Sequence, residues 1–412
     1  MTYTKSELAE LLHLFLDIGE EINAAGGEVF RVEDTIARLG EAYGATRVDV
    51  FAITSALEVT MAFPGDVELT RTRRLSGTRT DFKRLEALND LSRRCCASPM
   101  TAAELRSELS AALSRRRPLP LYLGSALAGG GDFAVFFGGG IVDGIFGALF
   151  ALLICLLQET LPRLFPNNVL VSFVAALLSG VGVGTVSLVP SLIHPDMVMI
   201  GDIMLLIPGI ALTVAIRNIL VGDTISGVLR LTESMVVAVA LAGGFMVAMS
   251  LFDIGYPGAN AHAPWVQLLC GAVGSVGFSL IFRLRERFLP LAALGGLVNW
   301  GAYLLLFRLT DNLFLSCLLA AVVAAVYAEL LAKRLHAPTT VFLVPAVIPS
   351  IPGSNLYYTM FGVVRGDWGY AAKNALLTAE YALALAAGMS IVFVLFATHQ
   401  KLLARIKNRK ER

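Results

Sequence analysis

Long apolar segments fill almost the whole chain after residue 117, and this feature constrains the fold more than any other. Ten such segments lie near 120–138, 140–158, 167–190, 196–221, 228–251, 264–282, 288–307, 312–332, 340–363 and 372–396. Each is close to the roughly 17–25 residues with which a helix crosses a hydrocarbon layer about 30 Å thick. The sequence therefore predicts an α-helical polytopic membrane protein with ten transmembrane helices.

The first 117 residues have a different composition. They hold 34 of the 65 Asp, Glu, Lys and Arg residues, although 56% of the whole chain is hydrophobic. A soluble domain averages about 45–50% apolar residues, so the charged part is expected to lie in water and the remainder in lipid. A net charge of +1 gives no indication of a nucleic-acid partner.

Local patterns in this charged part alternate between helix and strand. The segments RVDVFAIT, LEVTMAF and VELTRTRRL indicate strands, and a helix is expected over Arg31–Tyr43, ending at Gly44. Polar residues mark three further helix starts: Thr4 with Glu7, Thr80, and Thr101 with Glu104. Residues 1–117 are therefore predicted to form a small soluble α+β domain.

The distribution of Lys and Arg predicts the orientation. With the N-domain inside, the inner loops carry Arg163, Arg217, Arg230, Arg283, Arg285, Arg287, Lys333 and Arg334, and the outer loops carry Arg308, Arg365 and Lys373. This bias favours a cytoplasmic N-domain and C-terminus. The predicted parts are a cytoplasmic domain (1–117), a first five-helix repeat (118–252), a second five-helix repeat (264–398) and a basic cytoplasmic tail (399–412).

An internal repeat supports that division. LLIPGIALTVAIRNILVGD (205–223) and PSIPGSNLYYTMFGVVRGD (349–367) share Ile-Pro-Gly and a final Gly-Asp at an offset of 144 residues. The same offset aligns NVLVSFVAA (168–176) with NLFLSCLLA (312–320). Because five is odd, a second copy of a five-helix unit enters the membrane from the opposite side, so the halves are predicted to be inverted.

Each Ile-Pro-Gly falls about halfway along its span. Proline removes a backbone N–H and glycine weakens the helix, so each span is expected to split into two half-helices. The free N–H groups of the second half-helix suit an anion such as a carboxylate. A simple kink is the alternative. The predicted substrate-binding residues are Pro208, Gly209, Thr213, Pro352, Gly353, Ser354, Asn355 and Tyr358.

Carboxylates inside apolar spans are candidates for proton coupling, since a charge at the bilayer centre needs a partner, water or a proton. They are Asp132, Asp143, Asp202, Glu233, Glu329 and Glu380. Asp202, six residues before Pro208, is the first choice, and Asp143, Glu233 and Glu380 are kept as further candidates. Interface solvation is the alternative for Asp143, and Glu329 is expected to pair with Lys333.

Several functions find no support. The sequence contains no G-x-S-x-G, H-E-x-x-H, Walker A or C-x-x-C motif, and its five histidines are scattered. No metal site and no cofactor are therefore predicted, and the protein is not expected to be an enzyme. A membrane-anchored hydrolase would need a nucleophile and a base in residues 1–117, where His13 is the single histidine. A passive channel remains an alternative and predicts flux independent of a pH gradient.

Four stretches resemble the threonine/serine exporter family: AGGEVFRVEDTIARLGEAYG (25–44), TDFKRLEALNDLSR (80–93), IMLLIPGIALTVAIRNILVGDTISGVLRL (203–231) and FLVPAVIPSIPGSNLY (342–357). The resemblance implies a secondary exporter of small hydroxy amino acids (threonine, serine) in the bacterial inner membrane, driven by the proton motive force. Its partners would be the amino acid, protons and the lipid bilayer, and a homo-oligomer is left open.

Two alternatives come with this resemblance. Some relatives are linked to dicarboxylate (succinate) export, and the two Ile-Pro-Gly breaks could each take one carboxylate of such a substrate. In the N-domain, the family-like residues Gly26, Gly27, Arg31, Glu33 and Asp34 are interpreted either as a plain helix start or as a regulatory element.

Overall fold

The computed structural model describes residues 3–75, 80–114, 119–165, 167–206, 209–220, 222–252, 254 and 262–410. The chain forms two compact units. The smaller contains Met1–Pro118, Phe282–Glu286 and Ala332–Val341, and the larger contains Leu119–Ile281, Arg287–Leu331 and Phe342–Arg412.

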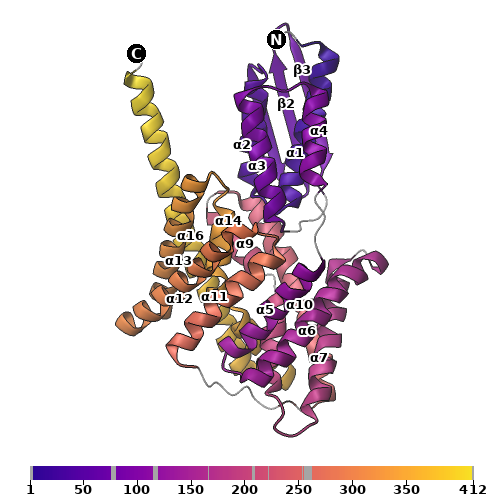
Figure 1. Ribbon diagram of the computed structural model, residues 1–412, viewed down its shortest axis with the longest axis vertical. Coiled ribbons are helices and arrows are strands. Elements are labelled where there is room, and N and C mark those ends of the chain that lie inside the picture. Colours follow the sequence, from indigo (N-terminus) through magenta and orange to yellow (C-terminus); the bar gives the residue numbers. More distant parts are fainter. Residues whose placement is uncertain are drawn as a thin grey trace. The chain divides into compact units, whose positions relative to one another are not determined.

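The smaller unit combines helices with one antiparallel sheet of strand order β1-β2-β3 (Figure 1). Its elements are α1 (Lys5–Ala24), α2 (Val29–Ala42), β1 (Arg47–Ile53), β2 (Ala56–Phe63), β3 (Val67–Arg74), α3 (Phe82–Ala97) and α4 (Ala102–Leu113). Alternate residues of β2 are buried, namely Leu57, Val59, Met61 and Phe63. One face of the sheet is therefore covered, by α1 and α2. The helices and strands predicted for this region are confirmed.

The helix caps explain where α1 and α3 begin. Thr4 and Glu7 form the predicted capping box, with the Glu7 N–H donating to Thr4 Oγ1 at 3.3 Å and the Thr4 N–H to Glu7 Oε2 at 2.8 Å. The prediction that Thr80 caps α3 is wrong. Asp81 is the cap, and its Oδ1 accepts the Arg84 N–H at 3.0 Å. The positive end of the helix dipole attracts the negative charge of a carboxylate, whereas a threonine hydroxyl carries no charge.

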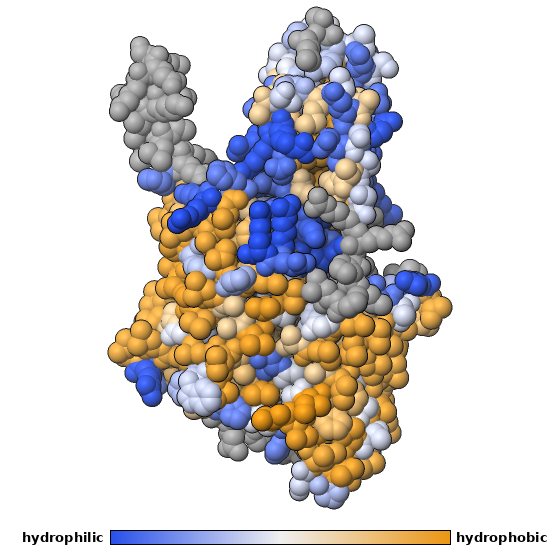
Figure 2. Space-filling model, viewed as in Figure 1, coloured by the Kyte–Doolittle hydropathy of each residue, from blue (hydrophilic) through white to orange (hydrophobic). Residues whose placement is uncertain are grey.

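The other helices form the larger, apolar part of the chain. They are α5 (Leu119–Phe136), α6 (Ile141–Leu164), α7 (Asn168–Ser187), α8 (Pro195–Leu206), α9 (Gly209–Leu220), α10 (Thr224–Leu251), α11 (Pro264–Ile281), α12 (Leu289–Thr310), α13 (Leu313–Leu335), α14 (Thr340–Val347), α15 (Gly353–Arg365) and α16 (Trp368–Lys410), with short 3₁₀ turns η1 (Glu286–Phe288) and η2 (Ile348–Ser350). Figure 2 shows hydrophobic residues over most of the visible surface of the larger unit.

Length and hydropathy identify the membrane spans. Within the described part of the chain, seven helices are long and apolar enough to cross a membrane, or eight if the bent pair α8 and α9 is one span. Two shorter apolar helices lie at Leu123–Phe136 and Thr340–Ser350. Exposed apolar side chains such as Leu149, Val239 and Leu305 lie along the long helices, as expected of surfaces in contact with lipid. The chain is a polytopic helical membrane protein.

Two of the expected spans are interrupted. The axes of α8 and α9 differ by 51°, and Ile207 and Pro208 between them lie outside the described residues. In the second interruption, α14 ends at Val347, η2 follows, Ile351 is extended, and α15 begins at Gly353 after Pro352. The prediction that the second Ile-Pro-Gly breaks its helix is therefore confirmed.

Candidate functional site at the broken spans

The second break leaves backbone groups without helical partners. Pro352 is the N-cap residue of α15, and its side chain makes no capping hydrogen bond. The Gly353 N–H donates to Ile351 O at 2.8 Å, and the Leu356 N–H to Pro352 O at 3.3 Å. No hydrogen bond from the backbone N–H of Ser354 or Asn355 is found within the described part of the chain. Two amide donors at the positive end of a helix therefore remain available to an anion.

This break packs against α8 of the first half. A Cβ atom on Gly353 would lie 2.1 Å from the Met204 sulfur, so glycine is the residue that lets the two segments approach. One turn further along α15, Tyr357 is fully buried and its hydroxyl lies 3.9 Å from the Met199 sulfur. The two interrupted spans are therefore in direct contact, although their Ile-Pro-Gly motifs are 144 residues apart.

The predicted substrate residues differ in their surroundings. Ser354, Asn355 and Tyr358 are half-buried, and the Tyr358 ring is edge-on to Tyr357 at 5.7 Å between centroids. Thr213 of α9 is buried. Pro208 lies outside the described residues, and Gly209 is described only as the first residue of α9. The predicted residues from Pro352 to Tyr358 thus lie together at the second break. The first break, at Pro208, lies partly outside the described residues.

Asp202 of α8 is completely buried. The Ser179 hydroxyl of α7 donates to Asp202 Oδ2 at 2.5 Å, and Oδ1 has no hydrogen-bond partner in the described part of the chain. Burying a carboxylate without full compensation is costly. A proton on the carboxyl or a cation bound to it would remove that cost. The geometry therefore suits a carboxyl that binds and releases a proton or a cation.

Asp143 has the contacts of a helix cap. Its Oδ2 accepts the Gly140 N–H at 2.7 Å at the start of α6, and its Oδ1 accepts the His194 N–H at 2.6 Å. The His194 Nδ1 atom lies 2.9 Å from Oδ2, so this carboxylate ties the loop before α8 to the α5–α6 turn. These bonds explain why an acid is buried at this position.

The other predicted acids lie elsewhere. Glu233 is exposed on α10, and Glu380 is half-buried on α16. Among the described residues, no hydrogen bond or ion pair joins Asp143, Glu233 or Glu380 to Asp202. The structure therefore does not gather the four predicted proton-coupling residues into one cluster.

Asp132 of α5 received no role in the sequence analysis beyond its place among the intramembrane acids. Its carboxyl lies against α11, where a Cβ on Gly274 would be 2.7 Å from Asp132 Oδ2. That oxygen is buried without a hydrogen-bond partner in the described part of the chain. The signal in the sequence was a single acid within the apolar stretch LAGGGDFAVF, but nothing local indicated which helix it faces.

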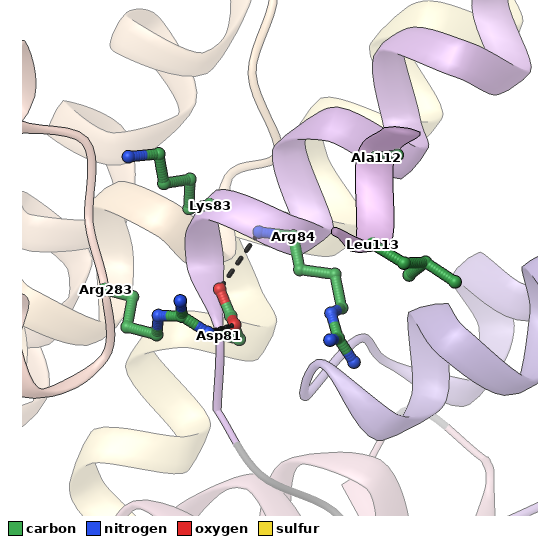
Figure 3. Close-up of a pocket in the computed structure, with 6 residues that line it drawn as sticks. All are labelled: Asp81, Lys83, Arg84, Ala112, Leu113 and Arg283. Carbon is green, nitrogen blue, oxygen red and sulfur yellow. Dashed lines mark hydrogen bonds and ion pairs between the residues drawn. The ribbon is translucent and has the colours of Figure 1, made fainter. Parts of the chain in front are cut away.

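In the smaller unit, a pocket lies at the N-terminus of α3 (Figure 3). Its lining residues are Asp81, Lys83, Arg84, Ala112, Leu113 and Arg283. Arg283 donates to Asp81 Oδ2 at 2.6 Å, and the Phe82 N–H donates to Phe282 O at 2.9 Å. Segment Phe282–Glu286 is therefore bound to α3 through both side-chain and backbone contacts.

The family-like segment before α2 has local structural roles. Gly26 has a left-handed φ of 87° and packs beside Thr80. Arg31 lies 3.8 Å from Glu28, and Arg38 pairs with Asp34 at 2.9 Å. Glu33 accepts the Ala52 N–H at 3.1 Å, which links α2 to β1. These contacts match the interpretation as a helix start.

Interrupted apolar helices that contact one another are typical of many membrane transport proteins. Comparison with known proteins specifies the family. Residues 13–252 match a threonine/serine exporter family model, and residues 267–395 match a second one, described as Threonine/Serine exporter, ThrE. This chain belongs to the threonine/serine exporter family.

A relative from Corynebacterium glutamicum carries the name threonine/serine exporter. It is 22% identical over 404 residues, which is 93% of this chain and 82% of the relative. No solved structure gives a significant match. The resemblance found in the sequence is confirmed at the level of the family.

Proposed function

We propose that this protein exports threonine and serine across the bacterial inner membrane in exchange for protons, by alternating access between two inverted five-helix halves. The observation that carries the proposal is the contact between the two interrupted spans, with α15 beginning against Met204 of α8, two residues after Asp202. Discontinuous helices that meet at a repeat interface are the usual binding sites of secondary transporters. On this proposal the protein is a transporter and not an enzyme.

The helix boundaries support two equivalent halves. Adding the repeat offset of 144 residues to the starts of α5, α6, α7, α8, α9 and α10 reproduces, within one residue, the starts of α11, η1, α13, α14, α15 and α16. Contacts between the halves are also reciprocal: α9 packs on α16, and α15 packs on α10. The two family matches divide the chain between residues 252 and 267, at the same boundary.

The substrate carboxylate would bind at the start of α15. Its N–H donors at Ser354 and Asn355 lack partners in the described part of the chain, and the helix dipole adds positive potential there. Pro352 and Gly353 would keep the backbone open, while Tyr358 and, from the first half, Gly209 and Thr213 would contribute to the same site. Pro208, the remaining candidate, lies outside the described residues. Substrate access from either side would follow from rocking of one half against the other.

Asp202 would carry the proton. It is buried, it has one hydrogen bond from Ser179, and its other oxygen has no partner among the described residues. In the deprotonated form it could meet the substrate ammonium, and in the protonated form it could return without substrate. Asp143, Glu233 and Glu380 remain secondary candidates, with Asp143 acting foremost as a cap. The excess of Lys and Arg in the predicted inner loops supports a cytoplasmic N-domain and C-terminus.

Inside-out vesicles test the proposal directly, because export in the cell becomes uptake there. An acidic vesicle interior should drive accumulation of labelled threonine. Asp202→Asn should abolish the gradient-driven part and also lower threonine exchange at equal pH, because asparagine mimics the protonated, substrate-free form, while the protein still reaches the membrane. Asp311→Asn is the matched control, since Asp311 is exposed in a left-handed turn that asparagine also adopts readily. Gradient-driven accumulation by Asp202→Asn would show that Asp202 is not the coupling acid.

Competition identifies the substrate class. Unlabelled serine should inhibit threonine uptake, and unlabelled succinate should leave it unchanged. Inhibition by succinate at a concentration similar to that of serine would favour the dicarboxylate alternative. Uptake that neither saturates nor responds to the pH gradient would favour a channel.

A further inference from the structure

A buried asparagine faces the second break from α12. Asn299 is completely buried, and its Nδ2 donates to the Ser350 hydroxyl of η2 at 2.6 Å. Its Oδ1 is buried and makes no hydrogen bond to the described part of the chain. Exchanging the amide oxygen and nitrogen would leave the nitrogen unpaired instead. In either orientation, one amide group lacks a protein partner beside the segment that interrupts the helix.

The helices around this asparagine are held close together. Gly271 of α11 packs against Pro349, and Gly296 of α12 lies against Ser275, where a Cβ would be 2.1 Å from the Ser275 hydroxyl. The Ser275 hydroxyl is also buried without a partner in the described part of the chain. Two buried oxygen atoms without partners in the described part of the chain, Asn299 Oδ1 and Ser275 Oγ, thus lie where α11, α12 and η2 meet.

The side chain that follows Asn299 in the chain does have a hydrogen-bond partner. The Trp300 indole N–H, one residue beyond Asn299, donates to Gln267 Oε1 at 3.1 Å. Buried polar groups in proteins are almost always hydrogen-bonded, so each one without a partner calls for an explanation. In a protein that accepts a small polar molecule between its helices, a ligand is the natural partner.

The chemistry of the group restricts that ligand. Asn299 and Ser350 are neutral, and each can both donate and accept hydrogen bonds. An amide and a hydroxyl match a neutral hydroxyl, which also donates one hydrogen bond and accepts others. A carboxylate or an ammonium requires an opposite charge or a helix dipole, and the structure offers those at α15 and at Asp202 instead.

We propose that Asn299, positioned by Ser350, binds the side-chain hydroxyl of the transported amino acid and so determines the preference for threonine and serine. This inference rests on the proposed function. Ser350, the hydrogen-bond partner of Asn299, precedes the first residue of α15 by three positions, so on this proposal one small molecule reaches both Asn299 with its hydroxyl and the start of α15 with its carboxylate.

The test compares each hydroxy amino acid with its counterpart that lacks the hydroxyl. Inhibition of labelled threonine exchange in vesicles is measured with threonine against 2-aminobutyrate, and with serine against alanine. Sites that hydrogen-bond a substrate hydroxyl discriminate strongly against analogues without it. The wild-type protein should prefer threonine, and Asn299→Leu should lower the threonine to 2-aminobutyrate preference at least about tenfold while retaining 2-aminobutyrate exchange.

A matched control and a milder variant keep the outcome clear. Asn374→Leu also replaces a buried asparagine, whose Nδ2 donates to Tyr370 O within α16, and should leave the preference unchanged. Ser350→Ala should lower the preference less than Asn299→Leu, and it serves as the test if Asn299→Leu does not reach the membrane. An unchanged preference in a variant that still exchanges amino acids overturns the inference. Absence of threonine transport by the wild-type protein would instead contradict the proposed function.

Discussion

Replacing Gly201 with alanine should force α8 away from α5. A Cβ at this position would lie 2.5 Å from Gly130 O, 2.9 Å from Ala134 N and 3.1 Å from Ala134 Cβ. Backbone and alanine atoms cannot turn aside as a long side chain can. Ordinary contact begins at 3.4 Å, so the two helices must separate by roughly 0.9 Å.

The change in the free energy of unfolding follows from two opposing effects. Overpacking of this kind costs about 1–3 kcal/mol. Alanine also gains up to about 1 kcal/mol in helix propensity over glycine. Gly124→Ala isolates the steric part, because Gly124 lies in α5 and a Cβ there would meet nothing within 4 Å. The propensity gain is common to both variants, so Gly201→Ala should be less stable than Gly124→Ala by about 1–3 kcal/mol.

The measurement is thermal unfolding of the purified full-length protein in one detergent, together with threonine exchange in vesicles. Gly124→Ala should unfold at or above the wild-type temperature and transport normally. Gly201→Ala should unfold several degrees lower, and its exchange should fall because Asp202 follows directly on the displaced helix. If Gly201→Ala is as stable as Gly124→Ala and transports at the wild-type rate, the close packing of α8 on α5 is wrong.

Two further predictions concern titratable groups outside the spans. The hydrogen bond to Asp143 raises the pKa of His194 in the loop before α8. The protonated His194 therefore stabilises the folded protein. This contribution is complete below the unfolded histidine pKa of about 6.5 and is lost as the pH rises through the folded-state pKa. The unfolding temperature should therefore fall as the pH is raised above that value. His194→Ala should flatten this part of the profile. A profile that His194→Ala leaves unchanged contradicts the assignment. In α3, burial raises the pKa of the Cys95 thiol to about 11. At mildly alkaline pH, Cys95 in the native protein should therefore react slowly with iodoacetamide, and it should react once the protein is unfolded. Mass spectrometry of a Cys96→Ser variant measures this labelling. Rapid labelling of Cys95 in the native protein would refute the prediction.

Features set by neighbouring residues could be predicted from the sequence. The apolar spans, the alternation along β2 and the capping box at Thr4 depend on residues close together in the chain. The break before Gly353 was predictable for the same reason, since proline removes its own N–H wherever it stands. The 144-residue offset was also visible, because it compares two stretches of sequence and requires no knowledge of packing.

The tertiary structure decided which of these residues meet. In the sequence Asp143 was one of several acids within the apolar spans, and only its bonds to Gly140 and His194 showed that it caps a helix. Asn299 had no evident role until its contact with Ser350, 51 residues away, left half of its amide unpaired. Hydropathy and helical period measure how apolar a segment is, but not which partner each polar atom finds. That choice depends on contacts between distant segments, and it separates a capping carboxylate from one available to a proton.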